Sequence, residues 1–462
     1  MKIIYKEIPW INPFDAFIQI KEDEPSFILE SLGIGTKTSR YSFIGTMPSA
    51  TITSSANTIT ILSNSQSQSF TGDPIETMRQ YLKGKELQDI NGLPPFIGGA
   101  VGYFGYDVVR LFEELPFKPY DDLKLPDMVL MIVNVIVAFD HQTKRVWIIA
   151  VANENDLSED KCLELMKKTE QRISKGCNPI YQVRHGLRIN IVSNLSNKEY
   201  IDMVRRCKEY ISSGDIFQAN LSQRFSAYIR DLEPLSIYRV LRKVNPSPFS
   251  AFIDTGEVQL VSSSPERLVM LKDGIVETRP IAGTRPRGRD QIENRILTKE
   301  LLTSEKERAE HIMLVDLERN DIGRVCRYGS IKVDEFMVLE SYSHVTHIVS
   351  NVAGKIESGK DFFDLIKAVF PGGTITGVPK IRCMEIIDEL EPKARGPYTG
   401  SLGYISYSGN MDLNIIIRTF IIKDGWAHVQ VGAGIVADSD PEREYNETLY
   451  KAEALFKTLE LL

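Results

Sequence analysis

Cysteine is scarce in this chain, which has 5 cysteines among 462 residues and no C-x-x-C pair. That spacing indicates neither a zinc ribbon nor a disulfide framework. Long hydrophobic runs are missing as well. The longest, at 128–139 (MVLMIVNVIVAF), contains Asn134 and is shorter than the ~20 residues of a membrane span. It predicts a buried strand. The amino terminus lacks the apolar segment of a signal peptide, so we expect a cytoplasmic protein with no membrane contact.

A surplus of basic residues is also absent. The 55 Lys and Arg are outnumbered by 62 Asp and Glu, and the net charge is −7. Proteins that bind nucleic acids usually carry a basic stripe, so no nucleic-acid partner is expected. The content of 42% hydrophobic and 25% charged residues is typical of a globular protein.

Strands and helices are grouped along the chain rather than alternating, which predicts an α+β fold. The first 150 residues read as short strands, and a polar stretch at 175–197 is the best linker. We therefore expect a strand-rich region at 1–190 and a second domain at 191–462. Amphipathic patterns predict helices over 198–212 and 297–317, and the turn at 272–274 predicts a hairpin over 267–278.

The glycine-rich segment at 98–106 (GGAVGYFGY) is similar in composition to a phosphate-binding loop. It lacks the lysine and serine of that motif. A tightly packed strand or bulge is the better interpretation.

Two pairs of glutamates share a spacing of three residues, which puts each pair on one helix face. The pairs are Glu307 with Glu310, and Glu444 with Glu447. The second pair follows Asp440-Pro441, which is a good helix start. Four carboxylates suit Mg²⁺, whereas a solvated charged face is the alternative.

Three further segments carry candidate chemistry. Glu266, set after a strand and a proline, is a candidate general acid if burial raises its pKa, or else part of a salt bridge at the strand end. The arginine-rich segment 278–289 around Gly283 could bind a small carboxylate or be a solvated loop. The segment 371–380, which ends in Lys380, is a candidate anion site at a helix start or a plain connection.

His344 and His347 form an H-x-x-H pattern on a predicted strand. Alternation along a strand places their rings on opposite faces. A shared metal is therefore not expected. One histidine is expected to act on the substrate, and the other to be structural.

Together these motifs make the chain resemble the family of chorismate-utilising enzymes, which contains anthranilate synthase component I, aminodeoxychorismate synthase component I, and the isochorismate and salicylate synthases. The resemblance is carried by DIFQANLSQRF (215–225), SPERL (264–268), ETRPIAGTRPRG (277–288), SEKERAEHIMLVDLERNDIGRV (304–325), FPGGTITGVPKIRCMEIIDELEP (370–392), RGPYTGSLGY (395–404) and GAGIVADSDPEREYNET (432–448). It implies two large antiparallel sheets packed as a sandwich with flanking helices. It also makes 191–462 the chorismate-binding catalytic domain.

The resemblance further implies roles for single residues. Glu310 and Glu447 would bind Mg²⁺, with Glu307 and Glu444 beside them. Glu266 would be the general acid that helps to expel the C4 hydroxyl, and His347 would lie near the ring. The catalytic set also includes Gln218 and Lys380. The substrate-binding set comprises Gly283, Thr284, Tyr398, Arg418, Gly432, Ala433 and Gly434.

Gln218 stands where isochorismate and salicylate synthases carry a lysine that activates water, so the resemblance favours the branches that transfer an amine. Asn220 and the GGTITG form at 372–377 are more similar to aminodeoxychorismate synthase. We therefore expect Mg²⁺-dependent amination of chorismate to 4-amino-4-deoxychorismate, for 4-aminobenzoate and folate. The alternative is anthranilate synthase component I, which forms anthranilate and pyruvate for tryptophan synthesis. Ala282 stands where some aminodeoxychorismate synthases have a nucleophilic lysine, which excludes a lysine adduct there.

The resemblance also extends to the pocket that binds tryptophan in the family. Its residues would be Leu29, Glu30, Ser31, Tyr41, Asn245, Pro246, Ser247, Pro248 and Phe249. A remote alternative is a non-catalytic module that binds an aromatic amino acid, but the acidic site residues are all present. Cys177 lacks the sharp turn and histidine partner of a glutaminase nucleophile. Ammonia is therefore expected from a separate glutamine amidotransferase subunit or from free ammonium.

Overall fold

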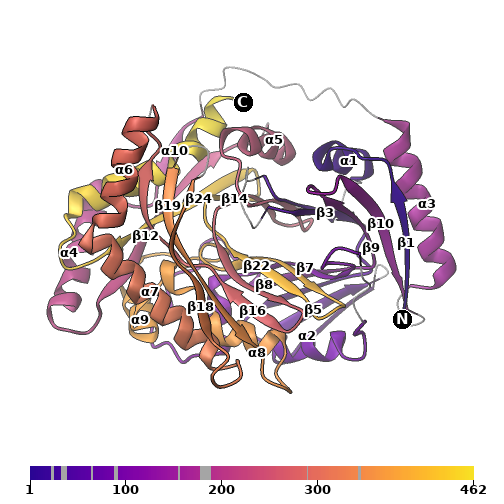
Figure 1. Ribbon diagram of the computed structural model, residues 1–462, viewed down its shortest axis with the longest axis horizontal. Helices are drawn as coiled ribbons and strands as arrows, with labels where there is room; N and C mark the ends of the chain where they lie inside the picture. The colour runs from indigo at the N-terminus through magenta and orange to yellow at the C-terminus, as the bar shows by residue number, and fades with distance from the viewer. Residues whose placement is uncertain are drawn as a thin grey trace.

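The computed structural model describes residues 1–21, 25–32, 39–63, 66–87, 92–153, 157–176, 189–230, 232–288, 290–341 and 345–462. Two antiparallel sheets of 12 strands each form its centre (Figure 1). This confirms the predicted α+β sandwich.

The first sheet has the order β1 (Lys2–Ile8), β10 (Arg145–Ala152), β9 (Val135–Asp140), β3 (Tyr41–Thr46), β2 (Ser26–Glu30), β13 (Phe249–Asp254), β14 (Gln259–Ser264), β23 (Thr419–Lys423), β24 (Trp426–Ile435), β12 (Gln218–Tyr228) and β11 (Ile191–Ser193), with β20 (Gly377–Val378) paired to β12. The second sheet has the order β17 (Ile281–Pro286), β19 (Val345–Lys355), β16 (Ile275–Thr278), β15 (Arg267–Lys272), β22 (Met411–Ile415), β21 (Ser401–Ser406), β7 (Gly99–Phe104), β8 (Met128–Val133), β4 (Ala50–Ser55), β5 (Thr58–Ser63) and β6 (Gln66–Thr71), with β18 (Lys332–Ser341) paired to β19.

Helices cover the outer faces of both sheets. The first sheet is covered by α1 (Pro13–Ile20), α3 (Glu159–Lys175), α4 (Asn197–Ser212), α5 (Pro234–Val244), α9 (Lys380–Leu390) and α10 (Pro441–Glu460). The second is covered by α2 (Pro74–Leu82), α6 (Gln291–Thr303), α7 (Glu305–Gly323) and α8 (Phe362–Val369). Short 3₁₀ turns, η1 (Tyr106–Leu111) and η2 (Gly373–Ile375), complete the described elements.

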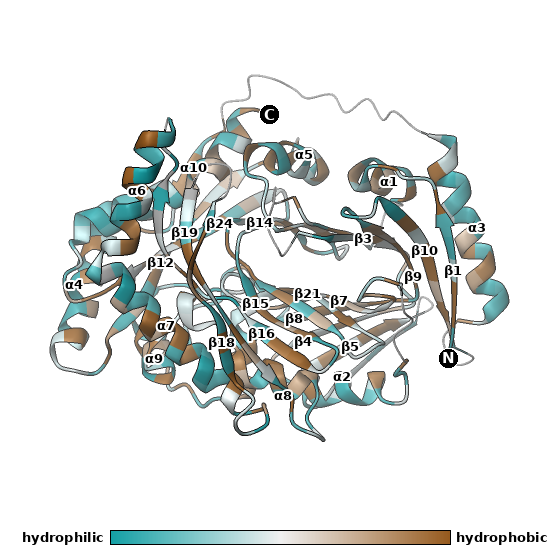
Figure 2. Cartoon of the chain, in the orientation of Figure 1, coloured by the Kyte–Doolittle hydropathy of each residue, from teal (hydrophilic) through white to brown (hydrophobic). Residues whose placement is uncertain are grey.

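Many strands are buried on both faces. In β10, Val146 and Ile148 pack under the helices of the first sheet, whereas Trp147 and Ile149 point into the core between the sheets. Alternation along a strand therefore buries every residue where both faces are covered. Figure 2 shows the resulting pattern, with apolar residues on the central strands and polar residues on the outer surfaces of helices such as α3.

Residues 128–139 do not form the single strand that their apolar run predicts. They form β8 in the second sheet and β9 in the first, and Asn134 stands between them. The Asn134 side chain donates to the Val151 carbonyl at 3.2 Å and accepts from the Ser49 hydroxyl at 2.9 Å. These bonds satisfy polar groups where the chain passes from one sheet to the other.

The helix predicted over 297–317 is also interrupted. Ser304 ends α6 and begins α7, with extended backbone and its hydroxyl accepting from the Glu307 N–H. A serine is a favoured N-cap, so it starts a new helix here. The helix at 198–212 and the hairpin at 267–278 are confirmed as α4 and as β15 with β16.

Both sheets draw strands from each side of residue 190. In the first, β2 pairs with β13, and in the second, β7 pairs with β21. The two predicted regions thus share both sheets, and the boundary itself remains a prediction. Among the described residues, no helix is long and apolar enough to cross a membrane.

The glycine-rich segment forms β7, as predicted, between β8 and β21. A Cβ on Gly102 would lie 1.9 Å from the Val129 carbonyl oxygen. We expect Gly102→Ala to lower the free energy of unfolding by about 1–3 kcal/mol, because the strands must separate. Gly323→Ala is the control, since its Cβ would lie 3.6 Å from Ile331 Cδ1. Equal urea midpoints for the two variants would contradict this packing.

Candidate active site

A buried carboxyl group stands between β14 and β15. Glu266 is 8% exposed, and its Oε1 accepts a hydrogen bond from the Thr374 hydroxyl at 2.8 Å. Burial raises the pKa of Glu266 to about 7, although the bond from Thr374 and the charge of Lys451 act to lower it. A carboxyl group with this pKa can give up a proton near neutral pH. The neighbouring Arg267, not Glu266, forms the salt bridge at the strand end, with Asp412.

The floor of the site is the polar face of β12. Its apolar residues, such as Leu221, pack under α4 and α9, which leaves Gln218 and Asn220 on the other face. Glycines of the paired strand β24 make room for these side chains. A Cβ on Gly434 would lie 2.7 Å from Gln218 Nε2, and one on Gly432 would lie 2.7 Å from Asn220 Oδ1.

The first pair of predicted glutamates lies on α7, at two different places in the site. The Gln218 Nε2 donates to Glu310 Oε1 at 3.3 Å, so Glu310 faces the floor. Glu307 pairs with Arg285 at 3.1 Å. A Cβ on Gly283, whose φ is +70°, would lie 2.9 Å from Glu307 Oε2. Glycine at this bulge of β17 therefore lets the helix approach closely.

The second pair lies on α10, which begins at the predicted Asp440 cap. Glu447 pairs with Lys451 at 2.8 Å, and the same ammonium donates to the Gly432 carbonyl at 2.9 Å. Lys451 thus links α10 to the floor of the site. Glu444 is half-buried on the same helix.

The four glutamates have the side-chain type that binds Mg²⁺, but in this structure they do not come together around one point. Carboxylate oxygens are the ligands that Mg²⁺ prefers. However, the described part of the chain gathers no group of three acidic, histidine or cysteine side chains that could hold a metal ion. Two of the glutamates instead hold a cationic side chain, Arg285 or Lys451. Positive charge therefore already lies on both sides of the site.

A half-buried guanidinium supplies the site with positive charge. Partial removal from water lowers the pKa of Arg418, and across the described residues no carboxylate forms a salt bridge with it. Burial lowers the pKa of His347 to about 4, and the positive charge of Arg418 lowers it further. A neutral His347 donates to the Gly283 carbonyl. A partly desolvated cation without an anionic partner is suited to bind a carboxylate.

The ammonium group of Lys380 is engaged by groups of the protein itself. Its ammonium bonds to Asp321 Oδ2 at 2.5 Å and to the Val369 carbonyl at 3.0 Å. Burial raises the pKa of the adjacent Glu318 carboxyl, and the nearby Asp321 carboxylate raises it further. Contact of Lys380 with substrate remains a prediction. So does the role of Thr284, whose side chain lies outside the described residues.

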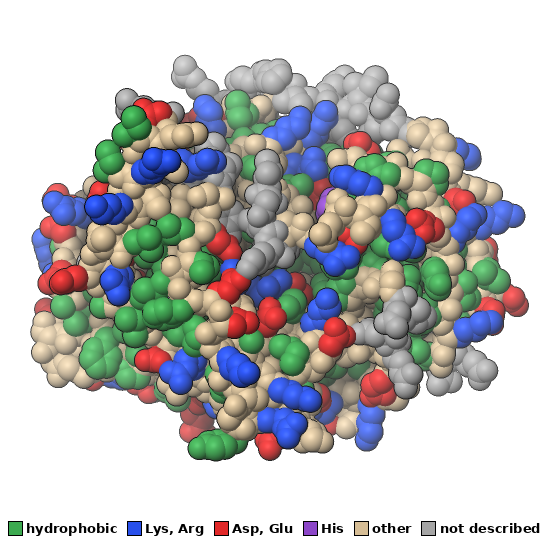
Figure 3. Space-filling view, viewed as in Figure 1, with side chains coloured by type: hydrophobic (Ala, Val, Ile, Leu, Met, Phe, Trp, Pro, Cys, Tyr) green, Lys and Arg blue, Asp and Glu red, His purple; other side chains and the backbone are tan. Residues whose placement is uncertain are grey.

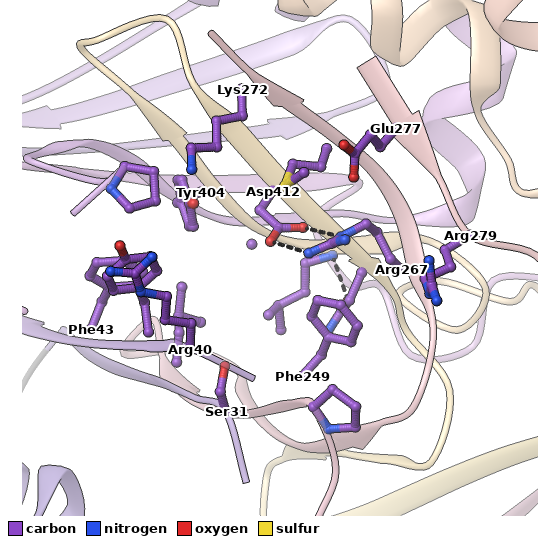
Figure 4. A pocket seen from close by; sticks show the side chains of 18 of the residues that line it. Ser31, Arg40, Phe43, Phe249, Arg267, Lys272, Glu277, Arg279, Tyr404 and Asp412 are labelled. Atoms are coloured by element: carbon purple, nitrogen blue, oxygen red, sulfur yellow. Dashed lines mark hydrogen bonds and ion pairs between the residues drawn. The ribbon is translucent and has the colours of Figure 1, made fainter. Parts of the chain in front are cut away.

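A separate cavity of about 460 Å³ lies between the two sheets. Leu29, Ser31, Tyr41, Pro248 and Phe249, which were predicted for a tryptophan pocket, line it; binding of tryptophan there stays a prediction. Figure 4 shows the Arg267–Asp412 pair on its wall, beside Phe249.

Other predicted pocket residues are engaged elsewhere. The carboxylate of Glu30, another lining residue, is held by Tyr238 and Arg242 at 2.6 and 2.7 Å. Asn245, Pro246 and Ser247 are not part of the lining.

On the face in Figure 3, basic and acidic side chains are interspersed.

Known proteins share this arrangement over nearly the whole chain. A model of the family described as chorismate binding enzyme matches residues 25–457. The chain belongs to this family. It is 43% identical to the anthranilate synthase component 1 of Acetivibrio thermocellus, over 97% of this chain and 93% of that protein. It is 42% identical to the aminodeoxychorismate synthase component 1 of Bacillus subtilis, over 100% and 96%.

A solved structure of a family member is also similar. The anthranilate synthase component I of Streptococcus pneumoniae superimposes with a TM-score of 0.82 at 34% identity, covering 96% of this chain and 97% of that one. The chain is therefore an enzyme of the chorismate-utilising family with the sandwich fold of component I.

Sequence reasoning did not predict three side-chain pairings in the site. Thr374 is the hydrogen-bond partner of Glu266, Arg285 is that of Glu307, and Lys451 is that of Glu447. The lysine carries a signal, because it lies four residues after Glu447, where a helical ion pair forms. Such pairs are frequent on solvated helices, so the spacing alone does not mark a site.

The pKa of Glu266 predicts a stability difference that depends on pH. The folded state holds the Glu266 proton up to about pH 7, whereas the unfolded chain loses it near pH 4.5. Stability from this group is therefore complete below pH 4.5 and lost as pH rises through 7, to the extent of roughly 3 kcal/mol. Glu266→Gln removes that loss, so we expect it to gain stability over the wild type between pH 5 and pH 8.

Urea unfolding of both proteins at these two pH values measures the difference. Glu305→Gln, at an exposed position of α7, is the control and should show no such change. An equal difference between Glu266→Gln and wild type at both pH values would contradict the raised pKa.

Proposed function

We propose that this chain aminates chorismate with ammonia from a partner glutamine amidotransferase subunit, and that it forms anthranilate and pyruvate. Similar relatives from several bacteria are named anthranilate synthase component 1, and fewer are named aminodeoxychorismate synthase. A component 1 implies a second component, and a glutaminase is the one that an amination needs. The comparisons thus support the alternative of the sequence analysis better than its first choice.

The observation that carries the proposal is that one site contains both a cation that can bind a carboxylate and an acid that can donate a proton. Arg418 is a half-buried cation without a carboxylate partner among the described residues, and Glu266 is a buried acid with a pKa of about 7. Chorismate has two carboxylates and a C4 hydroxyl. Arg418 and Tyr398 would bind one carboxylate, and Glu266 would give its proton to the hydroxyl.

In this reaction ammonia would form a bond to C2 of the ring, the ring double bonds would shift, and the C4–O bond would break, so that the hydroxyl leaves as water with the Glu266 proton. The new ammonium group would then give up a proton, which replaces the one that Glu266 lost. Loss of the C2 proton and cleavage of the C3–O bond would then release the enolpyruvyl group as pyruvate and leave the aromatic ring of anthranilate. Gln218 on the floor is an amide, which cannot act as a general base to activate water. This favours ammonia as the nucleophile.

Glu310 and Glu447, with Glu307 and Glu444 beside them, would hold Mg²⁺. The ion would supply positive charge for the ring carboxylate of chorismate. Arg285 and Lys451 would have to release two of these glutamates. Tryptophan binding in the cavity beside Arg267 stays a further prediction.

A second candidate product is 4-amino-4-deoxychorismate. It is favoured by the Bacillus subtilis relative, which matches the whole chain, and by Asn220 and the 372–377 motif. Ala282 excludes a lysine adduct at its position.

Incubation with chorismate, Mg²⁺ and ammonium distinguishes the two products. We expect fluorescent anthranilate without any added lyase. Formation of 4-aminobenzoate only after addition of aminodeoxychorismate lyase would establish the second candidate. Consumption of chorismate to neither amine would overturn the proposed function.

Glu310→Gln tests the metal site. We expect the substitution to lower turnover by at least about 100-fold, because a carboxylate ligand is lost at the point of highest charge. Calorimetric titration should show weaker Mg²⁺ binding, while the urea midpoint stays near that of the wild type. The matched control is Glu305→Gln on the same helix. Unchanged turnover and unchanged Mg²⁺ affinity in Glu310→Gln would remove Glu310 from the metal site.

A further inference from the structure

Asn220 is a buried polar residue that takes no part in the proposed reaction steps. It lies on β12, two residues after Gln218, and it is 7% exposed. A buried amide costs free energy unless its donors and acceptor are paired. The partners of Asn220 therefore show what this side chain organises.

One set of partners belongs to the turn η2. The Asn220 side-chain N–H donates to the Ile375 carbonyl at 3.2 Å, and its main-chain N–H donates to the Thr376 carbonyl at 2.9 Å. Thr374, which precedes these two residues, bonds to Glu266 at 2.8 Å. Asn220 thus fixes the turn that carries the hydrogen-bond partner of the proton donor.

The other partner is Tyr398. Burial raises the pKa of the Tyr398 phenol, and the Asn220 amide, as a hydrogen-bond donor to the phenol oxygen, lowers it. Both groups converge on Gly432, where a Cβ would lie 2.7 Å from Asn220 Oδ1 and 2.8 Å from Tyr398 Oη. The tyrosine hydroxyl and the amide are therefore held against the same glycine of β24.

A buried ion pair makes this arrangement rigid. Arg395 donates to the main-chain carbonyl of Asn220 at 2.7 Å and to the Ile375 carbonyl at 3.1 Å. Its charge is balanced by Glu391 at 2.7 Å, and both side chains are almost fully buried. The backbone of Asn220 and that of the turn thus share one anchor, so neither can shift alone.

We propose that Asn220 is a positioning residue that fixes the proton donor Glu266 relative to Tyr398. This inference rests on the proposed function, in which Glu266 expels the hydroxyl and Tyr398 binds a carboxylate. Asparagine suits the task because the two N–H groups of one short amide can serve both the Ile375 carbonyl and the Tyr398 oxygen. Aspartate and valine lack these donors.

Asn220→Val tests the proposal in the chorismate amination assay. We expect kcat to fall, because the Thr374 turn loses a bond, and KM to rise, because Tyr398 loses its partner. Together kcat/KM should fall by about 10–100-fold, as for a small misplacement of reacting groups. Asn220→Ser, whose hydroxyl is too short to reach both partners, gives the same expectation if the valine variant does not fold.

Asn134→Val is the matched control. Asn134 is also buried, and its side chain also donates to a carbonyl at 3.2 Å, but it lies where β8 passes into β9. We expect this variant to lose stability without any change in kcat/KM. An equal fall of kcat/KM in Asn134→Val and Asn220→Val would overturn the positioning role.

A double-mutant cycle with Tyr398→Phe separates positioning from general support. If Asn220 acts on KM through the Tyr398 hydroxyl, Asn220→Val should raise KM by less than about twofold in the Tyr398→Phe background. Independent, multiplying increases in KM would overturn the proposal. The same cycle followed by urea unfolding needs no turnover, and additive midpoint shifts there would overturn the contact. Lack of amination by the wild type would instead overturn the proposed function.

Discussion

Removal of water from around the side chains of Glu266 and Arg418 is the constraint on which the site depends. It raises the pKa of the Glu266 carboxyl to about 7 and lowers that of the Arg418 guanidinium. The first effect keeps a proton on an acid near neutral pH. The second makes an unpaired cation costly, so an anionic ligand that pairs with it gains affinity. Both properties come from burial rather than from the residue types alone.

The sandwich produces this burial from segments far apart in the sequence. Strands of the first 150 residues pair with strands that follow residue 190 in both sheets, and helices cover the outer faces (Figure 1). Polar residues are then placed on one face of β12, and glycines of β24 open the space above them. The dry environment of Glu266 therefore depends on the whole chain.

The sequence pattern predicted those elements that are determined by residues close together in the chain. The amphipathic period of α4 and the Lys272-Asp273-Gly274 turn between β15 and β16 were sufficient. The division of 128–139 between two sheets was not predictable, because the apolar run carries no mark of which sheet each half joins. The single polar residue Asn134 was the only sign of the change. The polar residues 66–71 carry no alternating strand pattern, yet they form an edge strand that is held by pairing with β5.

For the site, the sequence predicted which residues matter better than how they are paired. Glu266 was a candidate from its place after a strand, but its partner Thr374 comes from a turn more than 100 residues away. The glutamate pairs lie on two helices as predicted, yet Arg285 and Lys451 bind them in the described structure. Such long-range pairings follow from the tertiary fold and have no local signature.

The protonation state of Glu266 tests the account most directly. It can be measured by infrared difference spectroscopy between the wild type and Glu266→Gln, as pH is raised from 5 to 9. The account predicts a carboxylic acid C=O band at pH 5.5 that is replaced by carboxylate bands with a midpoint near pH 7. Carboxylate bands already complete at pH 5.5 would contradict it.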